Sequence, residues 1–145
     1  MNDAKWSFWD VVDLLRQRDG RFRREAYGFV VAALGATVEA LPPDRLSDPE
    51  RRHLSGRELV EGTVTLARRE FGPLAPMVFR EWGVTRSEDI GAIVFQLVEA
   101  GQLSARPEDT LEDFRGGSEL LEALGEVRES DAPPADPAAR PGRAE

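Results

Sequence analysis

The chain has no cysteine, which excludes disulfide bonds, thiolate metal sites and cysteine nucleophiles. His53 is its single histidine, and one imidazole without a second His or a Cys does not make a zinc site. No apolar run approaches the roughly 18–20 residues that a membrane span requires, and the first residues lack a signal-peptide pattern. We therefore expect a cytoplasmic protein that makes no use of the membrane.

The motifs of several enzyme classes are also missing. The sequence contains neither the G-x-x-x-x-G-K-[ST] loop nor a strand followed by G-x-G-x-x-G, and its serines lie outside a G-x-S-x-G context. Adjacent acidic residues such as Glu108 and Asp109 lack the spacing of a calcium-binding loop. We expect no enzyme activity, no cofactor and no metal site.

The overall composition is that of one folded domain followed by a tail. Of the 145 residues, 41% are hydrophobic and 32% are charged, a balance typical of soluble globular proteins. Residues 130–145 contain no apolar side chain larger than Ala or Pro, so burial there cannot offset the entropy lost on ordering. The sequence predicts a single helical domain over residues 5–128 and a disordered Pro/Ala-rich tail over residues 129–145.

Capping residues and helix stops divide most of the chain into helices. Ser55 and Glu58 match the S-x-x-E capping box, the clearest of these signals. Thr85 and Glu88 are predicted to form a second capping box, and Gly101 is placed to end the helix that follows. The predicted helices run approximately from Ser7 to Gly20, Tyr27 to Leu41, Ser55 to Phe71, Leu74 to Trp82 and Thr85 to Gly101, with a last short helix from about Ser118.

Two features of these helices concern packing. Gly62 lies inside a predicted helix at a cost of about 1 kcal/mol relative to Ala, which a closely packed neighbour would explain. The helix over residues 74–82 is expected to present Leu74, Met77, Val78 and Trp82 to the core. Both expectations are specific enough for a structure to test.

Residues 102–114 fit either a short β-hairpin or an irregular loop. With the hairpin, the order of elements over residues 55–114 is that of a winged helix-turn-helix. The predicted fold class is therefore mainly α, a compact domain of about six helices with a winged-helix-like element in residues 55–114. Carboxylates at the start of the second motif helix would repel phosphates, so this element favours protein contact over groove binding.

Several segments together resemble one family. They include Arg24–Leu34, His53–Gly62, Phe71–Val84, Asp89–Leu103 and Asp113–Gly117. In this combination the chain is similar to a small, uncharacterised bacterial family of conserved hypothetical proteins first catalogued in planctomycetes and verrucomicrobia. The resemblance covers most of residues 8–125, implies a single compact domain, and brings no catalytic residue with it.

The excess negative charge is concentrated in one part of the chain. Residues 1–85 carry 13 acidic and 13 basic residues, whereas residues 86–129, which we call the acidic half, carry 11 acidic residues and four arginines. We predict a non-enzymatic protein–protein interaction or regulatory module in which this half meets an unknown protein partner; a solvated acidic surface is the other interpretation. The residues predicted for the interaction face are Glu88, Asp89, Glu99, Glu108, Asp109, Glu112 and Asp113.

A dense group of arginines around Gly20 suggests an alternative function, a transcriptional or nucleic-acid-binding module. These side chains would contact phosphates, and Phe22 would stack on a base. Nearby acids such as Asp13 and Asp19 would neutralise much of this charge, and the net charge of −8 makes nucleic acid a poor partner. The interpretation that we favour is a salt-bridged elbow. The group, called the arginine cluster below, comprises Arg16, Arg18, Arg21, Arg23 and Arg24.

Overall fold

The structure is a computed structural model that describes residues 6–103, 114 and 119–125. It is mainly helical, and no strand occurs within these described ranges. No helix among them is long and apolar enough to cross a membrane. The elements are α1 (Phe8–Arg18), α2 (Arg24–Glu39), α3 (Pro43–Leu46), α4 (Gly56–Phe71), the 3₁₀ turn η1 (Gly72–Leu74), α5 (Ala75–Trp82), α6 (Ser87–Glu99) and α7 (Leu120–Gly125).

Local capping explains where several of these helices begin and end. At α4, the Ser55 hydroxyl accepts a hydrogen bond from the Glu58 N–H at 3.1 Å, and the Glu58 carboxylate accepts one from the Ser55 N–H at 2.9 Å. The predicted capping box is therefore confirmed. Gly83 ends α5 with a φ of +84°, and Gly101 follows α6 with a φ of +79°, as expected of glycines that stop a helix in the left-handed region.

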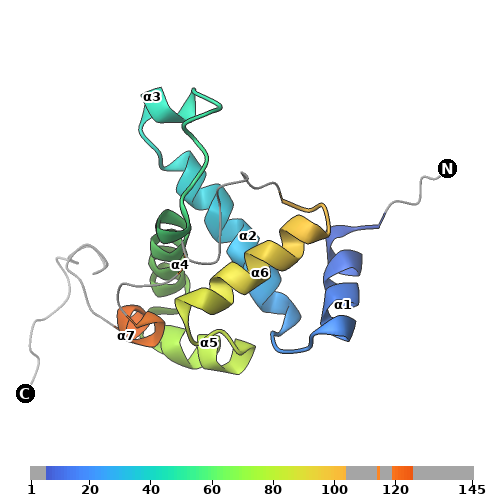
Figure 1. Ribbon diagram of the computed structural model, residues 1–145. Coiled ribbons are helices and arrows are strands. Elements are labelled where there is room, and N and C mark those ends of the chain that lie inside the picture. The colour runs from blue at the N-terminus through green and yellow to red at the C-terminus, as the bar shows by residue number, and fades with distance from the viewer. Residues whose placement is uncertain (1–5, 104–113, 115–118, 126–145) are drawn as a thin grey trace, which may run out of the picture.

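The helices pack around α2, which lies across the middle of the domain (Figure 1). Its most extensive contact is with α4, α1 packs near its N-terminal end, and α6 crosses it. α5 and α7 pack together against α4 on the opposite side from α1. α3 stands apart from this body, at the end of the connection that leaves α2 and returns to α4.

Aromatic side chains join α2, α4 and α5 in the core. Phe29 of α2 contacts Phe71 of α4 and both Phe79 and Trp82 of α5, with ring centroids 5.4–5.8 Å apart. Such pairs contribute about 0.5–1.5 kcal/mol each beyond the area that they bury. The largest fully buried side chains elsewhere include Tyr27 and Phe22 near α1, and Ile90, Ile93 and Leu97 along α6.

The expected core face of α5 is wrong in two positions. Leu74 and Met77 are 57% and 64% exposed, whereas Ala75 and Phe79 are buried. The reason is that the chain turns through η1 before α5 begins at Ala75, and residues four apart on this short helix then face the core. Trp82 is half-buried against the core, as predicted.

The expected hairpin over residues 102–114 receives no support. No strand occurs among the described residues, and positions 104–113 of the predicted hairpin lie outside them. The structure supports the coarser prediction, a mainly helical domain. The predicted tail over residues 129–145 also lies outside the described residues.

Candidate functional site

The residues predicted for the acidic interaction face have different surroundings. Glu99 is exposed at the end of α6, and Glu88 is half-buried in its first turn. Neither forms an ion pair with another residue that the structure describes. The remaining positions other than Asp89 lie outside the described residues; they are Glu108, Asp109, Glu112 and Asp113.

Asp89 is a helix cap and not part of an exposed face. Its side chain is buried, and one carboxylate oxygen accepts hydrogen bonds from the N–H groups of Thr85 and Arg86, both at 3.0 Å. The predicted pairing of Thr85 with Glu88 is wrong because α6 begins at Ser87, which makes Asp89 the residue that reaches back over the first turn. The placement of Asp89 on a partner-binding face is corrected accordingly.

Most of the arginine cluster is held by acceptors of the protein itself. Arg16 donates to the carbonyl oxygen of Phe22 at 2.7 Å, and Arg23 pairs with Glu81 at 2.8 Å. Arg24 pairs with Asp13 at 3.1 Å and lies over the ring of Trp9.

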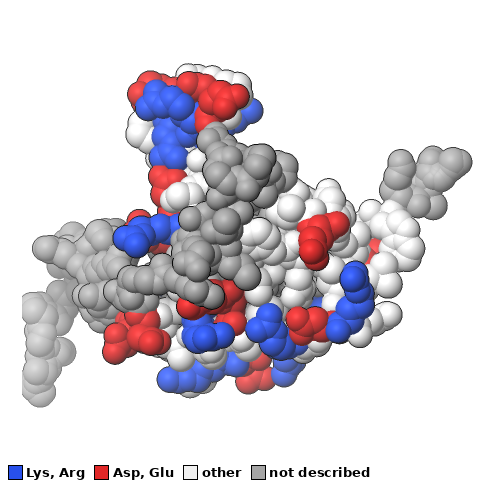
Figure 2. Space-filling view, in the orientation of Figure 1, with Lys and Arg blue, Asp and Glu red and all other residues white. Residues whose placement is uncertain are grey.

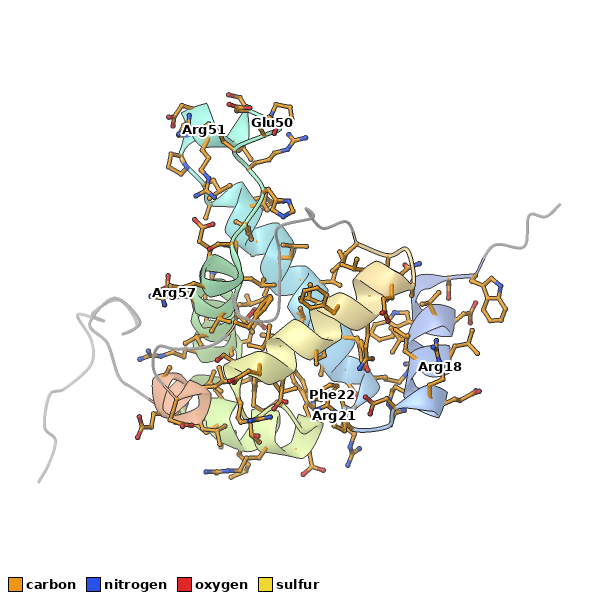
Figure 3. All side chains as sticks on the ribbon, in the orientation of Figure 1. Arg18, Arg21, Phe22, Glu50, Arg51 and Arg57 are labelled. Atoms are coloured by element: carbon orange, nitrogen blue, oxygen red, sulfur yellow. The ribbon has the colours of Figure 1, made fainter. Side chains whose placement is uncertain are left out.

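The last two members of the cluster differ from each other. Arg21 lies 3.6 Å from Asp19 and 3.7 Å from Asp89, and its guanidinium covers the ring of Phe22. Arg18 is exposed on α1 (Figure 3). In Figure 2, basic and acidic groups alternate along the edge formed by α1 and α5, so the view shows no separate basic surface there. This arrangement supports the salt-bridged elbow.

A partly buried polar link connects α2 to α6. The hydroxyl of Tyr27 donates a hydrogen bond to the Gln96 side-chain oxygen at 2.6 Å, and the Gln96 amide donates to Asp19 at 3.4 Å. Burial, with a further contribution from Asp19, raises the pKa of Tyr27 above its ordinary value. The phenol therefore stays protonated at neutral pH and acts as a structural donor.

The strongest candidate for a binding site is a cavity of about 350 Å³ between α2, α6 and the segment that enters α4. α2 contributes Val30, Leu34 and Val38 to its wall, and α6 contributes Val94 and Phe95. Residues 52–55 supply the polar part of the wall. The volume lies within the range of about 300–1,000 Å³ that is usual for small-molecule pockets.

Arg45 fixes the polar wall of the cavity to α4. Its guanidinium pairs with the Glu58 carboxylate at 2.6 and 2.8 Å, and also donates to the backbone carbonyl oxygens of Arg51 and His53. The hydrogen bond from Arg45, assisted by the N–H of Ser55, lowers the pKa of Glu58 from 4.5 to about 2. Arg45 therefore links the segment around His53 to the start of α4, because it binds the His53 carbonyl and the Glu58 carboxylate at the same time.

The shifted carboxyl makes a prediction about stability and pH. Because the pKa of Glu58 is lower in the folded state, its ionised form stabilises the protein above about pH 4.5, and this contribution is lost as the pH falls towards 2. We expect Glu58→Gln to lower the free energy of unfolding by about 1 kcal/mol near neutral pH. Urea denaturation at several pH values should show the difference from wild type shrinking below pH 4.5; a constant difference would contradict the assignment.

No local sequence pattern indicates this cavity. Its lining residues come from four separate parts of the chain, from Val30 to Phe114, and each fits an ordinary core position on its own. As the single histidine of the chain, His53 does not by itself indicate a pocket. The one available signal was the polar Arg52–His53 pair directly before the capping box of α4.

Among the described residues, no group of three or more His, Asp or Glu side chains is placed to hold a metal ion. Comparisons of the chain with protein-family models, curated proteins and solved structures found no match. The resemblance to the planctomycete and verrucomicrobial family therefore stays a prediction.

Proposed function

We propose that this protein is a non-enzymatic interaction or regulatory module whose acidic half meets a basic protein partner. The observation that carries the proposal is the difference in net charge between the two parts of the chain. Residues 1–85 balance acidic and basic residues, whereas residues 86–129 have a net charge of −7 from 11 acids and four arginines.

Among the described residues, five acids of residues 1–85 and one acid of residues 86–129, Asp89, lie within ion-pair distance of an arginine. The five include Asp13, Glu58 and Glu81, whereas other exposed acids of residues 1–85, such as Glu39 and Glu61, form no ion pair with another described residue. In the acidic half, Glu99, Glu119 and Glu122 are exposed without an ion pair to another described residue, and this half has seven more acids than arginines. Charge that the chain does not compensate is available to attract a partner of opposite sign.

A nucleic-acid function has weaker support. Four of the five arginines in the cluster are already hydrogen-bonded or paired within the protein. The start of α6, which a winged helix-turn-helix would place in a DNA groove, has Ser87, Asp89, Ile90 and Gly91 buried. A protein partner for the acidic half is therefore the function that we favour.

The test is the affinity of a captured partner for matched charge-reversal variants of the full chain. The partner is isolated with the tagged wild-type protein and identified by mass spectrometry, and its affinity is then measured with purified components. We expect Glu99→Lys/Glu108→Lys/Asp109→Lys to weaken binding by about tenfold or more, and the wild-type affinity to fall as salt is added. We expect the thermal midpoint to change little; Glu99, the described one of the three positions, is exposed.

The control variant changes the same number of charges elsewhere. Glu39, Glu61 and Glu70 are exposed acids of the first 85 residues that form no ion pair with other described residues. Reversing these three to lysine should leave the affinity nearly unchanged. Equal losses in both variants, or no loss in either, would show that the acidic half does not form the interface.

A further inference from the structure

The polar residues that line the cavity between α2 and α6 all come from one segment, which also contributes the apolar Pro49, Leu54 and Leu59. The apolar wall is formed by branched and aromatic side chains such as Leu34, Val94 and Phe95. The polar wall is one short segment that carries Arg52, His53 and Ser55. A ligand that fills this space therefore needs an apolar body and one polar end.

The charge of the polar wall determines which charge the polar end of the ligand should carry. Around the connection between α2 and α4, the acid Glu58 is paired with Arg45 and the acid Asp44 lies 3.5 Å from Arg51. Arg52 is exposed and forms no ion pair with any described residue. Arg52 is therefore a cationic side chain in the lining of a largely apolar cavity, in a connection that also contains the acids Asp48 and Glu50.

We propose that this cavity binds a small aliphatic carboxylate. The aliphatic chain lies between α2 and α6, where it leaves water for contact with Leu34, Val94 and Phe95. The carboxylate lies at the Arg52 guanidinium, whose planar fork of N–H donors matches two carboxylate oxygens. This binding does not depend on the proposed acidic interface, since the two use different residues.

The rigid attachment of the polar wall supports a preformed site. Arg45 holds the backbone carbonyl of His53 and the side chain of Glu58 at once, so the segment that carries Arg52 is fixed to α4 before any ligand arrives. A site that is already ordered loses less conformational entropy on binding. The pairing of Arg45 with Glu58 is therefore a positioning element for the site.

The test uses the full chain, labelled for NMR on its Val and Leu methyl groups and titrated with sodium octanoate. We expect saturable shifts of the Val30, Leu34 and Val94 methyl signals. Two probes with the same chain and other heads, 1-octanol and octylammonium, should bind about fivefold to tenfold more weakly than octanoate, because they cannot form the charge-assisted contact with Arg52.

Three variants separate the polar contact from the cavity itself. Arg52→Gln should reduce the octanoate affinity to that of 1-octanol and leave 1-octanol unaffected. Arg57→Gln is the matched control, because Arg57 is exposed and points outward from α4, away from α2 and α6 (Figure 3). Val94→Trp, which fills the cavity, should weaken both ligands; if it does not fold, Leu34→Phe serves the same purpose.

Several results would overturn the proposal. Octanoate that gives no saturable shift, or that shifts methyl groups away from the cavity, would remove the site. Equal affinities for the three probes, or equal losses in Arg52→Gln and Arg57→Gln, would remove the carboxylate as the recognised group. Strong ligand-free NOEs between residues 104–113 and the Leu34 and Val94 methyl groups, unchanged by octanoate, would show that the chain fills the cavity itself.

Discussion

Replacing Gly83 by alanine should destabilise the protein by about 3 kcal/mol, the largest effect that we expect from a single methyl group. Gly83 ends α5 with a φ of +84°, a left-handed conformation that costs an alanine about 1 kcal/mol. A Cβ atom there would also overlap the backbone carbonyl oxygen of Arg21. Because that oxygen belongs to the main chain, no side-chain rotation relieves the overlap, which adds about 1–3 kcal/mol.

The position of Arg21 beside Gly83 is fixed by a second contact. The N–H of Arg23 donates to the carbonyl oxygen of Trp82 at 3.1 Å, which holds the turn between α1 and α2 against the end of α5. To relieve the overlap, this turn would have to move away from α5 and break that hydrogen bond. The alanine variant should therefore loosen the contact between the two turns as well as destabilise the fold.

Urea denaturation followed by circular dichroism measures the effect, with Gly101→Ala as the control. Gly101 has a similar φ of +79°, and a Cβ atom there would meet no atom of the described residues within 4 Å. Its substitution should cost about 1 kcal/mol, the conformational part alone. If both variants lost the same stability, the contact with Arg21 would carry no energy and the explanation would be wrong.

Gly62→Ala should destabilise the protein by about 2 kcal/mol, although alanine is the better helix former by about 1 kcal/mol. Gly62 lies where α4 crosses α2, and an added Cβ atom would overlap the Thr37 hydroxyl and lie 3.0 Å from the Thr37 Cβ. The Thr37 hydroxyl donates to the Ala33 carbonyl at 2.6 Å, so turning the side chain away sacrifices a hydrogen bond. The two helices must otherwise separate along their most extensive contact.

A double-mutant cycle tests whether Thr37 causes the loss. Thr37→Ala removes the hydroxyl and the methyl group that crowd position 62, so the combined variant should recover at least half of the stability lost in Gly62→Ala. Gly35→Ala is the control, because Gly35 lies on an exposed part of α2 with nothing within 4 Å of an added Cβ, and should stabilise the protein by about 1 kcal/mol. A Gly62→Ala variant as stable as wild type would contradict the close crossing.

Local sequence signals predicted the ends of helices well. The capping box of Ser55 and Glu58 and the stop at Gly83 depend on residues within one turn of each other, so their geometry follows from the sequence. The same reasoning failed at Thr85 and Glu88 because a shift of one residue in the start of α6 transfers the capping role to Asp89. The carboxylate of Asp89, which was predicted to face a partner, is therefore buried in the first turn of its own helix.

Local sequence signals of this kind could not predict the candidate site. Leu34, Val94 and Phe95 read as core residues of two separate helices, and the space between them exists only because α6 crosses α2 beside the segment entering α4. Arg52 stood in the sequence among other arginines, and nothing there separated it from Arg51, which lies against Asp44. Whether Arg52 forms an ion pair with another described residue depends on which acids the folded chain brings close to it.

By itself, the sequence determined that the protein is mainly helical, where several of its helices start and stop, and that its negative charge is concentrated in residues 86–129. These properties depend on composition or on neighbours a few residues apart. Tertiary structure alone decided that Gly62 meets Thr37, that the arginine cluster is largely neutralised, and that a cavity lies beside Arg52. The physical reason is that each depends on how helices distant in sequence cross, which sums many weak packing contacts along the whole chain.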